Sequence, residues 1–156
     1  MENDRDFSSF NREWPEFLNE VGTALPGVQL LFGFLLTAPF SANFPKLTSE
    51  LKHVYFVCFL CTSAACAFLI APSVYHRLHW RRDVRDKEQM IRTCNRLVIT
   101  GIGLLAVAMT AAIYVIASVM ASHLVTLLAT GIAGLTFSGL WFLLPLLRRQ
   151  RELKQS

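Results

Sequence analysis

Four long apolar stretches restrict what this chain can fold into. They cover approximately residues 21–40, 54–75, 97–120 and 124–147, and none has Asp, Glu, Lys or Arg in its middle. A helix of about 20 apolar residues crosses the hydrocarbon core of a bilayer, and a short soluble chain has no interior for four such helices. The sequence therefore predicts an all-α, polytopic membrane protein whose four transmembrane helices form a single domain over residues 1–156.

The composition supports this class. Hydrophobic residues make up 53% of the chain and charged residues only 17%, which is typical of a polytopic membrane protein. The net charge of +4 would suggest nucleic acid as a partner in a soluble protein. Here the basic residues lie beside the apolar stretches, which favours membrane lipids and argues against nucleic acid. No basic, cleavable signal peptide precedes the first stretch, so we expect that stretch to be its own anchor.

The distribution of basic residues predicts the orientation. Two precede the first stretch, two lie in the first loop, seven in the basic loop 77–96, none near 118–123, and four in the tail 148–156. Basic residues accumulate on the cytoplasmic side. We therefore expect both termini in the cytoplasm, in the cell's inner membrane. The residues expected to contact lipid headgroups are Arg77, Arg81, Arg82, Arg148 and Arg149.

Residues 1–20 are polar, yet bulky apolar residues recur at helical spacing toward their end. Phe10, Trp14 and Phe17 belong to this stripe, and Pro15 favours a helix that starts beside it. The pattern predicts a cytoplasmic arm with a short interfacial helix that leads into the first span.

The first span is the most irregular of the four and carries the strongest candidate site. It contains Pro26, Pro39 and the amide Gln29. Amides, hydroxyls and backbone carbonyls can replace the hydration shell of an ion. This pattern predicts an ion path lined by Gln29, Gly33 and Thr37, with an apolar gate near Phe32 or Leu36. The alternative is that Gln29 makes only an interhelical hydrogen bond.

Three ionisable residues near the span ends are candidates for proton or cation coupling or for pH sensing. Glu20 precedes the apolar part of the first span, and His76 and His79 follow the second. A carboxylate at the membrane edge can bind a proton or a cation, and histidine titrates near neutral pH. The more ordinary interpretation makes Glu20 a cytoplasmic helix residue and the two histidines interfacial side chains that face lipid headgroups.

Other motifs indicate packing. Cys58 and Cys61 form a C-x-x-C within an apolar helix, away from any redox fold, and we interpret them as packing residues. Small side chains recur at helical spacing in the later spans, which favours close helix contacts. A bundle this thin favours a homo-oligomer. No nucleotide, protease or metal motif is present, so no enzyme activity, metal or cofactor is expected.

Three runs resemble a family of small bacterial four-span membrane proteins. They are Gly27–Phe40, Ile70–Arg77 and Asn95-Arg96-Leu97. The family is functionally uncharacterised, and some members have a loose sodium:proton antiporter label. The resemblance implies a membrane role and directs attention to the first span and the corner around Arg77.

Three functions remain open from the sequence. The first is a small homo-oligomeric ion channel lined by the first span. The second is a non-transporting scaffold or accessory subunit that binds another membrane protein. The third is a proton- or cation-coupled transporter that uses Glu20.

Overall fold

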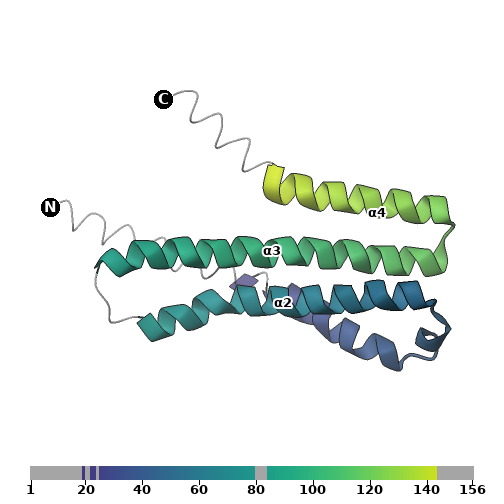
Figure 1. Ribbon diagram of the computed structural model, residues 1–156, viewed down its shortest axis with the longest axis horizontal. Helices are drawn as coiled ribbons and strands as arrows, with labels where there is room; N and C mark the ends of the chain where they lie inside the picture. The colour runs from purple at the N-terminus through teal and green to yellow at the C-terminus, as the bar shows by residue number, and fades with distance from the viewer. Residues whose placement is uncertain (1–18, 20–21, 24, 80–83, 144–156) are drawn as a thin grey trace.

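The computed structural model describes residues 19, 22–23, 25–79 and 84–143, and this part of the chain is helical without strands (Figure 1). The first helix covers Leu25–Phe40. The remaining elements, in chain order, are η1 (Ala38–Phe40, the 3₁₀ end of the first helix), η2 (Phe44–Lys46), α2 (Ser49–His79), α3 (Val84–Met120), α4 (His123–Ser138) and the π-helical η3 (Gly139–Leu143).

Successive long helices run in alternating directions, and α3 lies between α2 and α4 (Figure 1). The first helix packs over both α2 and α3. One end of the bundle therefore holds η1, η2 and the turn between α3 and α4, and we call it the η2 end. At the opposite end α2 finishes and α3 begins, and we call it the His79 end.

Three helices are long and apolar enough to cross a membrane: Ser49–Val74, Arg92–Met120 and His123–Trp141. These segments fit the spans expected at 54–75, 97–120 and 124–147. Leu25–Phe40 is shorter, about 24 Å at 1.5 Å per residue. Residues 19, 22 and 23 are also helical, but 20–21 and 24 lie outside the described residues, as does most of the arm 1–20. The first predicted span, residues 21–40, therefore stays a prediction over its full length.

The boundaries between helices show where the chain turns. The backbone of the basic segment 77–96 is helical at 77–79 and again from Val84, so these positions extend α2 and α3. At the other end Ser122 adopts an extended conformation, with ψ of 157°, and α4 starts at His123. Two residues, Ala121 and the extended Ser122, are enough to reverse the chain without glycine or proline.

Two small clusters of buried side chains hold the first helix, α2 and α3 together. Near the His79 end, Val28 packs with Leu69 and Val98. Toward the η2 end, Leu35 packs with Tyr55, Cys58 and Ala108, and the Cys58 thiol donates to the Ala108 carbonyl at 3.1 Å. The small-residue face of α2 is thus used inside one protomer.

The helices α2 and α3 approach each other closely at Gly101. A Cβ atom there would lie 3.1 Å from Leu69 Cγ and 3.2 Å from Phe68 Cβ. These distances are tighter than ordinary van der Waals contact, so a side chain at this position would push on Leu69 and Phe68, and glycine permits the close approach of the two helices.

The end of the first helix is determined by Pro39. A residue at this position would normally donate its N–H to the carbonyl of Leu35, but proline has no N–H. The chain tightens into η1, and the buried Tyr55 hydroxyl donates to the Leu35 carbonyl instead. The position of Tyr55 near a span end is typical of an interface anchor, but the structure places it inside the bundle.

Candidate functional site

The first helix has one face toward the bundle and one away from it. Val28 and Leu35 are buried against α2 and α3. Gln29, Gly33 and Leu36 are exposed on the other side, and a Cβ atom at Gly33 would meet nothing within 4 Å. The stripe predicted to line an ion path therefore lies on the outer surface of the protomer.

The remaining two residues of the predicted path differ in position. Thr37 is exposed, and its hydroxyl donates to the Phe34 carbonyl at 2.9 Å. Phe32 is half-buried and stacks on Phe59 of α2, with 5.4 Å between ring centroids. Of the two gate candidates, Leu36 shares the exposed face with Gln29, whereas Phe32 packs against the neighbouring helix.

Most of the charged candidates lie beyond what the structure describes. His76, Arg77 and His79 have a described backbone within α2, but not described side chains. The candidates outside the described residues altogether are Glu20, Arg81, Arg82, Arg148 and Arg149. The structure therefore neither brings these groups together nor separates them.

A groove of about 740 Å³ lies between α3 and α4. Its lining combines small residues with hydroxyl groups, including Thr110, Tyr114, Gly131 and Ser138. The Thr130 hydroxyl also faces this groove, and it is buried without a hydrogen-bond partner among the described residues. Helical spacing identifies the small face of α4, but only the structure shows that this hydroxyl is unsatisfied.

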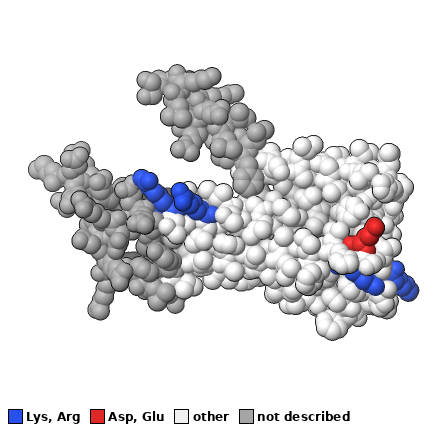
Figure 2. Space-filling model, viewed as in Figure 1, with Lys and Arg blue, Asp and Glu red and all other residues white. Residues whose placement is uncertain are grey.

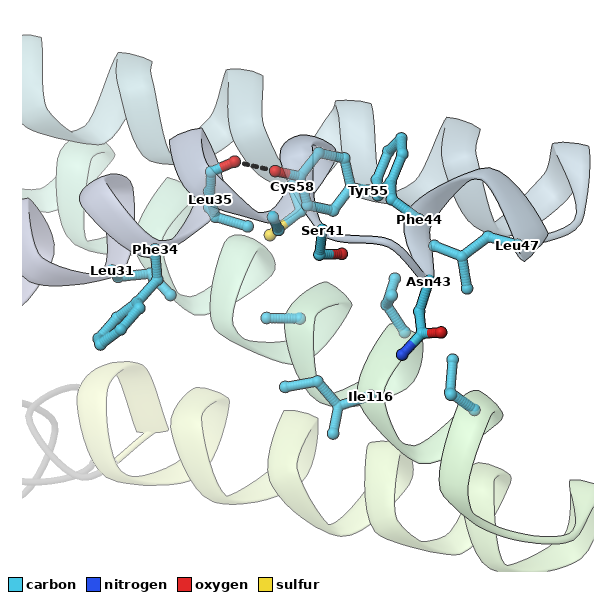
Figure 3. A pocket seen from close by; sticks show the side chains of 14 residues that line it. Leu31, Phe34, Leu35, Ser41, Asn43, Phe44, Leu47, Tyr55, Cys58 and Ile116 are labelled. Carbon is cyan, nitrogen blue, oxygen red and sulfur yellow. Dashed lines mark hydrogen bonds between the residues drawn. The ribbon is translucent and has the colours of Figure 1, made fainter.

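A second pocket, of about 290 Å³, opens at the η2 end (Figure 3). Apolar side chains from the first helix, α2 and α3 form its walls, among them Leu31, Phe34 and Ile116. Ser41 and Asn43 are its polar residues, and Asn43 points from the connecting segment toward α3 (Figure 3). The pocket exists because η2 folds back over the bundle, with Phe44 edge-on to Tyr55 at 5.0 Å between ring centroids.

Charge is confined to the ends of the described surface on the face seen in Figure 2. Lys and Arg side chains appear near both ends, and an uncharged belt separates them (Figure 2). The described residues contain no group of three or more His, Cys, Asp or Glu side chains that could hold a metal ion. An uncharged belt between charged ends is the surface that a bilayer requires.

Comparison with protein families adds one finding. A family of unknown function, DUF6328, matches residues 3–145. The chain belongs to DUF6328. Membership in an uncharacterised family is thereby confirmed, and the match covers all the helices described above. Comparison with curated proteins and with solved structures found no match.

Proposed function

We propose that this protein is a small homo-oligomeric channel of the cell membrane, in which first helices of several copies surround an ion path. The carrying observation is that Gln29, Gly33 and Leu36 face away from their own bundle. The path would run between copies, and each protomer would supply one wall.

The amide of Gln29 supports an inward position in an oligomer. Gln29 is exposed and has no hydrogen bond among the described residues. An amide that faces lipid without a partner costs several kcal/mol, on the order of 2–7. Both a neighbouring copy and a water-filled path would satisfy the amide, whereas lipid chains would not.

The path requires no fixed charge in the membrane. The Gln29 amide, the backbone at Gly33 and the Thr37 hydroxyl can coordinate ions as neutral dipoles. Leu36, which is 46% exposed, would narrow the path and gate it by dewetting. Histidines and basic residues at the His79 end would supply sensitivity to pH or lipid.

The proposed orientation places both termini and the His79 end in the cytoplasm. The alternating directions of the helices are consistent with this arrangement (Figure 1). The basic segment 77–96 and the tail 148–156 then lie on the side where basic residues accumulate. The η2 end, with Lys46 and Lys52, would face the opposite side.

Ion flux from purified protein in liposomes tests the channel. Wild-type protein is expected to release trapped ions, and Gln29→Ala is expected to change the flux at least several-fold because the path loses its main polar group. Leu30→Ala is the matched control, since Leu30 is its exposed neighbour at 63%. Absence of flux for common cations, anions and protons would contradict the proposal.

Glu20→Gln separates the channel from a coupled transporter. A channel lined by the first helix should keep its flux after this change, because Glu20 lies before the apolar part of the span. Loss of flux in Glu20→Gln, with flux retained in Gln29→Ala, would favour coupled transport through the carboxylate.

A scaffold or accessory subunit is the second candidate, and α4 favours it. Only 6% of the residues in the span of α4 are buried, and its groove with α3 contains the unpartnered Thr130 hydroxyl. Interhelical hydrogen bonds from such groups join membrane helices. Copurification of a stoichiometric second membrane protein that is lost in Thr130→Val would support this function.

A further inference from the structure

The pocket at the η2 end has an apolar interior, and two lysines lie on the segment beside it. Its interior holds about 290 Å³ and is walled almost entirely by carbon, with Leu31, Phe34 and Ile116 among its lining residues. It lies at the level of the helix ends, beside the segment that contains η2 (Figure 3). Lipid chains are the apolar material available to such a pocket if the helices span a bilayer.

Such a pocket must be filled by hydrocarbon. An empty space loses the dispersion contacts of its lining atoms, and a lipid chain is the material that surrounds it. Lipid chains are as apolar as leucine, however, so the interior alone gives no preference for one lipid over another. Any selectivity must come from the segment beside the pocket.

Two ammonium groups lie on the segment 41–52 beside the pocket, and we call this segment the mouth. Lys46 Nζ donates to Asn43 Oδ1 at 3.2 Å, and Asn43 itself lines the pocket. Lys52 Nζ donates to the Pro45 carbonyl at 3.0 Å. Each ammonium has three N–H donors, so both lysines keep donors for another group. The Ser41 hydroxyl lines the same pocket.

The charge balance at this end favours an anion. Glu50 is the single acidic residue between Gly22 and Tyr75, against two lysines. A phosphate diester offers negative charge and oxygen acceptors, which fits a mouth made of donors.

A second copy of the chain fits this mouth less well than a lipid does. Copies in one membrane share an orientation, so a neighbour's lysines would lie at the same depth, and like charges repel.

We propose that this pocket binds one acyl chain of an anionic phospholipid, whose phosphate is held by Lys46, Lys52 and the Asn43 amide. This site is separate from the ion path and from the basic residues expected to contact headgroups at the His79 end. Its occupant joins the first helix, the η2 segment, α2 and α3, which all line the pocket.

Native mass spectrometry of the full-length protein tests the site. Purified protein is mixed with phosphatidylglycerol or with phosphatidylcholine of the same chains, and bound lipids are counted. We expect one tightly retained phosphatidylglycerol per protomer. Lys46→Gln and Lys52→Gln should each weaken its binding about fivefold, the effect of one cation near a lipid phosphate. Arg96→Gln removes the same charge at the His79 end and should leave this lipid bound.

A second pair of variants tests the acyl-chain pocket. Ile116 is 60% exposed and lines the pocket, so Ile116→Trp fills it without entering the core. This change should lower retention of both lipids. Ile99→Trp should leave the retention of both lipids unchanged, because Ile99 is exposed on the same helix and does not line the pocket. Glycerol phosphate, which lacks acyl chains, should not displace the bound lipid.

Several outcomes would overturn the site. Equal retention of the two lipids, an equal loss in Arg96→Gln, or unchanged binding in Ile116→Trp would each do so. A cross-link between copies through Ile116→Cys would show that a neighbouring protomer fills the pocket instead. Lipid binding is measured without ion flux, so these results are independent of the channel proposal.

Discussion

Pro39 cannot donate a backbone hydrogen bond, so the Leu35 carbonyl depends on the Tyr55 hydroxyl of the next helix. Both partners are buried in a span or at its edge, where no water can replace the donor. The contact joins the first helix to α2 and forms one wall of the lipid pocket (Figure 3). One missing N–H therefore accounts for both the end of the helix and the position of the tyrosine.

Removing the Tyr55 hydroxyl should destabilise the protein. Tyr55→Phe leaves the Leu35 carbonyl unsatisfied, which costs about 1–3 kcal/mol. We expect a lower free energy of unfolding in detergent, measured by denaturant titration. Tyr114→Phe is the matched control, because the Tyr114 side chain faces the groove and its hydroxyl forms no hydrogen bond among the described residues. Equal stability of the two variants would show that the Tyr55 contact contributes nothing.

For single residues, the sequence shows that a backbone carbonyl near Pro39 needs another donor, but it does not show that Tyr55 supplies it. It shows that Pro39 ends the first span, and it places Tyr55 near the start of the second. The hydrogen bond joins residues 20 positions apart, and no local pattern encodes such a pairing. Tyrosine near a span end is more often an interface anchor, so the sequence favoured the wrong environment.

Among the elements, α2 and α3 pack tightly against each other at Gly101. A branched side chain there would overlap Leu69 and Phe68 of α2. Overpacking of this kind costs about 1–3 kcal/mol. Gly101→Val should therefore lower the free energy of unfolding by this amount.

Gly131→Val of α4 is the control for Gly101→Val. It makes the same change in helix propensity, but a Cβ atom at Gly131 would meet nothing within 4 Å. We expect near-wild-type stability in detergent. If both variants lose stability equally, the loss does not come from the α2–α3 contact.

Element positions follow from the sequence because lipid demands long apolar helices. The break between α3 and α4 was placed near 118–123 by length alone, since no glycine or proline marks it, and Ser122 provides it. Helix faces were harder to predict. Cys58 lies on a face of small residues, and only the contact with Ala108 shows that this face packs within one protomer.

For the whole molecule, the proposed topology predicts which ends are accessible from outside the cell. The four native cysteines all lie in candidate spans. A membrane-impermeant thiol reagent should label Asn43→Cys in intact cells and Lys154→Cys only after lysis. The reverse pattern would invert the orientation, and labelling of both in intact cells would contradict the three spans that lie between these two positions.

The candidate site could be predicted from the sequence only in part. The polar stripe of the first span was visible because Gln29 stands out against apolar neighbours. The pocket at the η2 end was not visible, because it forms from segments near residues 35, 43 and 116 that are distant in the chain. The sequence pattern of one chain does not encode how several copies pack together, so it does not define the ion path between them.

Because the Leu35 carbonyl accepts from Tyr55 only in place of the N–H that Pro39 lacks, the need for a tyrosine at position 55 depends on the residue at position 39. With Pro39→Ala, the backbone could supply its own donor, and the phenolic oxygen would become dispensable. The double variant Pro39→Ala, Tyr55→Phe should then lose less stability than Tyr55→Phe alone. Among relatives, chains that replace this proline should also be free to replace the tyrosine, so the two positions should co-vary.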